Sequence, residues 1–254
     1  MISLPLLKQT IKSNQIIWAA MAAVSAILLA QFAALEMTQN LLFVIFYSIM
    51  VTLFPAIYSL ISSNKLLSKQ VDSGSMAYVL STPTSRFKIV STQILFSIIS
   101  TCLIFVLNSI VHIIVNQMFP LDIAVATGGS VLVAGKLTAQ MIILTNLSAC
   151  LASLAVSGLC FMFSGIFNRS KYAIGFSGVL VGVCILAGMM GMFGMLGVDS
   201  LENFKYVTLF SLYDYQSVLL GVNDWMSKSV AAGVISLIGY LIGGVWFCKK
   251  DLPL

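Results

Sequence analysis

The longest polar interruption in this apolar sequence is residues 62–93. A chain that keeps one compact polar element between apolar stretches is expected to use it to contact another molecule. What it contacts would decide what the protein does. The segment carries the charged side chains Lys65, Lys69, Asp72, Arg86 and Lys88.

A nucleotide site is not expected in this chain. A phosphate-binding loop needs four residues between its two glycines and Ser or Thr after its lysine, because its backbone NH groups wrap the phosphates and its hydroxyl holds Mg²⁺. The nearest stretch runs from Gly129 to Gly135 with five intervening residues, and Leu137 follows Lys136. We therefore predict that the chain is not an enzyme, binds no cofactor and does not hydrolyse ATP by itself.

The sequence has one histidine, His112, and no carboxylate lies inside a long apolar stretch. Asn108 stands four residues before His112, so the two would share a helix face. An ionisable residue inside a membrane helix is a functional candidate, here for a conduit or a dimer interface. The alternative is that His112 only hydrogen-bonds a neighbour. Asn146 is another candidate for interhelical hydrogen bonding.

Four methionines, Met189, Met190, Met192 and Met195, form a cluster near the end of an apolar stretch. Thioethers favour Cu(I), but methionine also fills adaptable apolar surfaces. No Cys or His stands at ligand spacing, so a flexible conduit lining is favoured over a metal site. The five cysteines are predicted to be small buried apolar residues.

The composition predicts an integral membrane protein. Hydrophobic residues make up 59% and charged residues only 8% of the 254 residues, against about 25% charged in a soluble domain. Apolar runs of about 20 residues predict spanning helices. We expect an all-α membrane protein with a single domain and six spans, at about residues 15–35, 41–61, 94–115, 139–167, 172–198 and 229–247.

Lysine and arginine are distributed unequally between the loops, and this predicts the orientation. With the N-terminus inside, ten of the 13 basic residues lie on the inner side, and only Lys136, Lys205 and Lys228 lie outside. We predict a multi-pass protein of the cell membrane with both termini in the cytoplasm. The basic charge is an orientation signal and gives no support to nucleic-acid binding.

The remaining segments carry weaker signals. Residues 1–14 are expected to form a short interfacial helix, with Pro5 in its first turn. The loop 116–136 is expected to be irregular. Residues 199–228 mix aromatic and acidic residues, which favours a short helix or a re-entrant pair at the outer interface.

Two small-xxx-small patterns, Gly178-x-x-x-Gly182 and Gly239-x-x-x-Gly243, allow close helix approach. They predict either packing within the chain or a dimer interface.

The middle of the polar segment predicts a short amphipathic helix. Residues 72–74 break the preceding run, and Ser75 is expected to cap a helix whose apolar side holds Met76, Val79 and Leu80, with Tyr78 beside it. Thr82 is expected to cap the next helix, with Pro83 in its first turn.

The string Asp72-Ser-Gly74-Ser-Met-Ala-Tyr78-Val-Leu80-Ser-Thr-Pro83-Thr-Ser-Arg86 resembles the signature of ABC-2-type transporter permeases. The resemblance extends to six spans with both ends inside, an amphipathic N-terminus, the aromatic segment 209–214 and a basic tail. Ser75, Gln70 and Gln93 depart from the residues frequent in that family.

The resemblance implies a membrane subunit of an ATP-driven exporter. The short helix between spans two and three would be a coupling helix that docks on a separate ATP-binding subunit, which binds the ATP and Mg²⁺. Two such subunits would act with two permeases, identical or similar, and spans two and five would shift at the permease dimer interface. The residues expected at the docking contact are Asp72, Gly74, Met76, Tyr78, Leu80, Pro83 and Arg86.

The uncharged spans favour a lipophilic or amphipathic substrate, such as a peptide, a lipid-like molecule or a drug, and antimicrobial peptides are the class we favour. Two alternatives stay open. One is a permease for a metal or other ion that uses the cluster Met189–Met195. The other is a membrane anchor or assembly protein without transport activity.

Overall fold

The computed structural model describes residues 2–35, 42–82, 84–127, 130–195, 201, 204 and 208–252. Six of its helices are long and apolar enough to cross a membrane, which confirms a helical membrane protein. The elements in chain order are α1 (Leu4–Ala34), the π-helix η1 (Leu42–Met50), α3 (Val51–Leu66), α4 (Ser68–Asp72), α5 (Ser75–Leu80), α6 (Arg86–Met118), β1 (Asp122–Thr127), β2 (Ser130–Lys136), α7 (Ala139–Ile166), α8 (Ser170–Met195), the 3₁₀ turn η3 (Leu209–Leu212), α9 (Tyr215–Leu219) and α10 (Asp224–Lys249).

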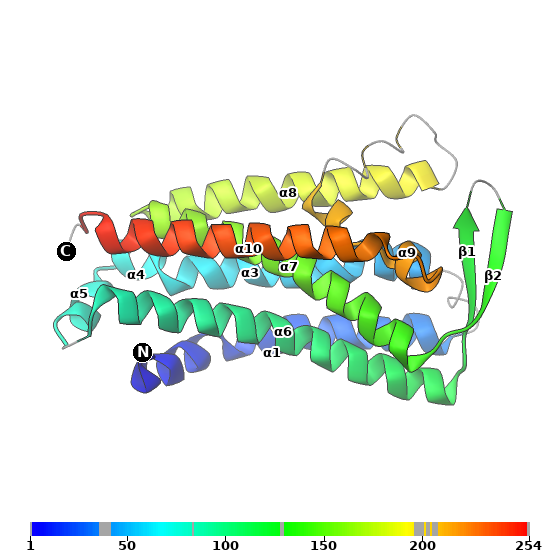
Figure 1. Cartoon of the computed structure of the whole chain (residues 1–254). Helices are drawn as coiled ribbons and strands as arrows, with labels where there is room; N and C mark the ends of the chain where they lie inside the picture. Colours follow the sequence, from blue (N-terminus) through cyan, green and yellow to red (C-terminus); the bar gives the residue numbers. More distant parts are fainter. Residues whose placement is uncertain are drawn as a thin grey trace.

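The long helices run side by side, and the two ends of the bundle differ (Figure 1). Both chain termini, α4 and α5 lie at one end, which we call the terminal end. The β1–β2 pair lies at the opposite end, which we call the hairpin end. The most buried long helix is α7, and α1 and α8 are the least buried.

Two segments differ from the sequence prediction. Residues 4–34 form one continuous helix with Pro5 in its first turn, so the separate interfacial helix predicted for residues 1–14 is wrong. Lys8 and Lys12 do not end the helix because lysine is itself a good helix former. The loop predicted to be irregular contains the antiparallel pair β1–β2, with a register shift between Ile123 and Ala124.

Glycines bring α7 and α10 into close contact. A Cβ added to Gly158 would lie 2.6 Å from the carbonyl oxygen of Ser236, and one added to Gly239 would lie 2.6 Å from the carbonyl carbon of Gly158. Real side chains do not approach backbone atoms this closely, so only glycine fits at these points. The pattern Gly239-x-x-x-Gly243 therefore serves packing within the chain.

The segment between α8 and α10 folds back against the bundle. Its described part forms η3 and α9, so short helical structure, one of the two predicted alternatives, is present here. Phe210, Tyr213 and Tyr215 are buried. Asp214 caps α9, where its carboxylate accepts from the backbone NH of Ser217 at 3.0 Å. It also pairs with the Lys228 ammonium at 2.5 Å.

Candidate functional site

The first candidate site is the short helix α5 at the terminal end. Gly74 precedes it with φ of +72°, in the left-handed region that favours glycine. The helix has two distinct sides. Met76 is 0% exposed and contacts the apolar cluster that includes Val71, Ile89 and Phe247, whereas Tyr78 is 81% exposed.

The boundaries of α5 differ in detail from the sequence prediction. The residue at its N-cap is Gly74, and Ser75 is already helical. The next helix, α6, is capped by Ser85, whose hydroxyl accepts from the backbone NH of Lys88 at 3.3 Å, so the predicted cap at Thr82 is wrong. The missed signal was Ser85 itself, because serine is as good a cap as threonine. Pro83 lies outside the described residues.

Three contacts join the α3–α4 region to the start of α8 and the end of α7. The Asp72 carboxylate accepts from the backbone NH of Ser170 at 3.2 Å, which places a negative charge at the first turn of α8. The Asn64 side-chain amide donates to the Ser170 hydroxyl at 2.9 Å. The backbone NH of Ser68 donates to the Ser164 hydroxyl at 3.1 Å.

Arg86 binds the end of α10. Its guanidinium donates to the backbone carbonyl of Lys250 at 2.8 Å and to that of Cys248 at 3.4 Å. The Lys250 ammonium in turn donates to the carbonyl of Phe167 at 3.3 Å, and burial lowers the pKa of Lys250 to about 8. The terminal end is thus held together by backbone-directed hydrogen bonds between α6, α10 and the α7–α8 junction.

The residues predicted at the docking contact therefore divide into two groups. Asp72, Met76 and Arg86 are engaged within the chain, and Leu80 is half-buried against the same apolar cluster as Met76. Among the described residues of this group, Tyr78 alone presents a large side chain to the exterior. We define the outer face of α5 as the exposed residues Ser75 and Tyr78 of the helix together with Ser81 and Thr82, which directly follow it.

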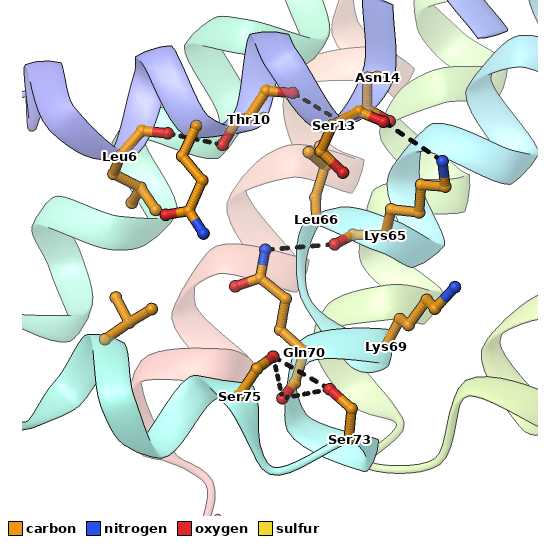
Figure 2. A pocket seen from close by; sticks show the side chains of 12 residues that line it. Leu6, Thr10, Ser13, Asn14, Lys65, Leu66, Lys69, Gln70, Ser73 and Ser75 are labelled. Carbon is orange, nitrogen blue, oxygen red and sulfur yellow. Dashed lines mark hydrogen bonds between the residues drawn. The ribbon is translucent and has the colours of Figure 1, made fainter. Parts of the chain in front are cut away.

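A polar cavity of about 320 Å³ lies beside α5, between the first part of α1 and α3–α5. Figure 2 shows Thr10 and Ser13 on one side of this cavity, and Lys65, Gln70 and Ser75 on the other. The Lys65 ammonium donates to the carbonyl of Ser13 at 3.4 Å, and the Gln70 amide donates to the carbonyl of Lys65 at 3.2 Å. No cavity was predicted for the lysines of this segment.

A buried polar cluster lies inside the bundle. The Tyr47 hydroxyl and Nδ1 of His112 are 2.5 Å apart, and the Asn146 amide donates to the same hydroxyl at 3.3 Å. Asn108 donates to the Ser25 hydroxyl on α1 at 2.9 Å. Nε2 of His112 and Oδ1 of Asn146 are buried without a hydrogen-bond partner among the described residues.

These contacts settle where the predicted intramembrane residues lie. Asn108 and His112 are 0% and 1% exposed, so neither lies on an outer surface where a second copy could touch it. Tyr47 was missed because a tyrosine inside an apolar run carries no local signal. It lies in η1, and π-helical turns are frequent at functional sites.

The predicted residues of α8 lie on a peripheral helix. Gly178 and Gly182 are half-buried, and a Cβ added to Gly182 would meet nothing within 4 Å. Met189 is exposed and Met190 is half-buried. The side chains of Met192 and Met195 lie outside the described residues. Within the described part of the chain, no group of three or more His, Cys, Asp or Glu could hold a metal ion.

The chain was compared with family models and with curated proteins. No family model and no curated protein matches it. Any functional assignment therefore rests on the residues and contacts described above.

Proposed function

We propose that this chain is the membrane-spanning subunit of an ATP-driven exporter of the ABC-2 permease type. A separate ATP-binding subunit docks on the outer face of α5, and a second permease completes the exporter. The observation that carries the proposal is the two-sided character of α5. Met76 fixes one side of a protruding helix in the bundle, and Tyr78 leaves the other side free for a partner.

The charge distribution supports a cytoplasmic position for α5. The terminal end carries the basic residues of α1, α3, α4, α6, the α7–α8 junction and the end of α10, whereas the hairpin end has Lys136 and Lys228 among its described residues. Cytoplasmic loops are enriched in Lys and Arg. In the proposed orientation both termini and α5 face the cytoplasm, where ATP is available.

The contacts around α5 provide a route for force to reach the spans. A push on α5 is transmitted through Met76 to the cluster that includes Phe96 of α6, Phe161 of α7 and Phe247 of α10. The α4 segment adds the Asp72–Ser170 contact to the start of α8. A rigid-body motion requires such a firmly attached element.

The proposed substrate is lipophilic or amphipathic, with antimicrobial peptides as the favoured class. None of the six spanning helices carries an acidic residue within its apolar stretch, so the spans offer no fixed negative charge to a cation. Export of a metal or other ion receives no specific support, because Met189 lies on the outside of α8.

The test is purification of the tagged chain from native membranes, followed by assay of ATP hydrolysis. An ABC-type ATPase is expected to co-purify, and its hydrolysis should rise when an amphipathic peptide is added. Tyr78→Ala should release the ATPase. The matched control is Tyr172→Ala, since Tyr172 is also an exposed tyrosine and lies in the first turn of α8, near the terminal end. Equal ATPase recovery with both variants would refute docking on α5.

A further inference from the structure

The cavity between α1 and α3–α5 has the composition of an anion site. Lys65 and Lys69 line it, and none of its twelve described lining residues is acidic. Within the described part of the chain, no carboxylate pairs with either ammonium. Two cations that share a cavity repel one another, and a bound anion would relieve that repulsion.

Uncharged polar side chains of α1 line the same cavity. They are Gln9, Thr10, Ser13 and Asn14. Gln9 and Ser13 are exposed, so their amide and hydroxyl groups are open to hydrogen bonds from a ligand. The cavity therefore offers both positive charge and neutral hydrogen-bonding groups to a bound anion.

The depth of the cavity fits the headgroup layer of a bilayer. A helix of 31 residues such as α1 is about 46 Å long, whereas the hydrocarbon core is about 30 Å thick. The lining residues of α1 fall between Leu6 and Asn14, within its first eleven residues. The apolar run predicted to span the membrane begins at about residue 15, so this part of α1 lies outside that run and beyond the hydrocarbon region.

We infer that this cavity binds the headgroup of an anionic phospholipid. The phosphate contacts Lys65 and Lys69, and the rest of the headgroup contacts the exposed polar side chains of Gln9 and Ser13. The volume of about 320 Å³ is roughly ten times the ~30 Å³ that one water occupies in the liquid, which leaves room for a phosphate and its substituent. Because Lys69, Ser75 and Val79 also line the cavity, a bound headgroup braces α4 and α5 against α1. The inference does not depend on ATPase docking.

The experiment measures lipid binding to the purified full chain in detergent, by native mass spectrometry and by the shift in unfolding temperature. The probes are short-chain phosphatidylglycerol, short-chain phosphatidylcholine and soluble glycerol 1-phosphate. We expect phosphatidylglycerol to bind and to raise the unfolding temperature. The double variant Lys65→Gln/Lys69→Gln should weaken its binding roughly 30-fold.

Two further variants control for charge and folding. Lys171→Gln/Lys249→Gln removes two exposed cations from the same end of the bundle, outside the cavity, and should bind like the parent protein. Lys65→Arg/Lys69→Arg keeps the charge and should retain binding. Equal loss in both glutamine variants, or equal binding of phosphatidylcholine, would overturn the site. If glycerol 1-phosphate displaces phosphatidylglycerol at equal concentration, the cavity binds a soluble phosphate ester and the assignment of a lipid ligand is wrong.

Discussion

Met76 should be the residue that holds α5 in place. A six-residue helix is far shorter than the ~12–15 residues at which isolated helices become marginally stable, so α5 depends on tertiary contacts. Met76 is fully buried, and Met→Ala at such positions costs about 2–5 kcal/mol. Even the lower value raises the fraction of molecules with α5 detached about 30-fold, since about 1.4 kcal/mol corresponds to tenfold.

Hydrogen exchange measures this detachment directly. In Met76→Ala, the amides of residues 79–81 should exchange about 30-fold faster than in the parent protein, because bonds such as Ser81 NH to Ala77 O are broken when α5 opens. The amides of α7 should be unchanged. Tyr78→Ala removes a larger side chain, but that side chain is 81% exposed. The free energy of opening α5, obtained from the exchange rates, should therefore change by less than about 0.5 kcal/mol.

The two variants should also separate stability from docking. In Met76→Ala, ATPase docking should be weaker and the amides of α5 should exchange faster. In Tyr78→Ala, ATPase docking should be weaker while the exchange of these amides stays as in the parent protein. Unchanged exchange of α5 in Met76→Ala would refute the claim that Met76 anchors the helix. Equal acceleration in Tyr78→Ala would refute the assignment of the two faces.

Three further predictions concern the bundle. Gly158→Ala should destabilise the protein by about 1–3 kcal/mol in thermal unfolding, because its Cβ would meet the α10 backbone at 2.6 Å. Gly182→Ala should be nearly neutral in the isolated chain, because its Cβ would meet nothing within 4 Å. Equal destabilisation by the two substitutions would contradict the α7–α10 packing. Tyr47→Phe should cost about 1–3 kcal/mol, since Nδ1 of His112 loses its partner; an unchanged unfolding temperature would argue against the buried network. Burial raises the pKa of Asp214, but the hydrogen bonds from Lys228 and Ser217 outweigh it and lower that pKa below 3.8. The stability this carboxylate contributes is therefore present above about pH 4 and is lost as the pH falls further. In Asp214→Asn, the unfolding temperature should no longer fall over that pH range for this reason. If the variant shows the same fall as the parent protein, another group is responsible.

The sequence predicted the features that local physics controls. The six spans follow from the thickness of the hydrocarbon core, which sets the length of an apolar run. The short helix α5 follows from Gly74 and from the spacing of Met76 and Leu80. The hairpin was not predicted because strand pairing depends on contacts between two segments, and neither β1 nor β2 alternates clearly.

The division of the docking residues could not be predicted. Asp72 binds a backbone group 98 residues away, and Arg86 binds the end of α10. A local pattern shows that such residues are polar, but not whether they face a partner or the same chain. For the same reason the cavity, which joins Asn14 to Lys65, emerged only from the three-dimensional arrangement.

The most direct test of the central claim is photo-crosslinking in intact cells, with a photoreactive amino acid at position 78. The outer face of α5 should crosslink to an ATP-binding subunit. The same amino acid at position 172 should give little of that product. Crosslinking to the ATPase from position 172 and not from position 78, or no crosslink to any ATP-binding protein from position 78, would contradict docking on α5.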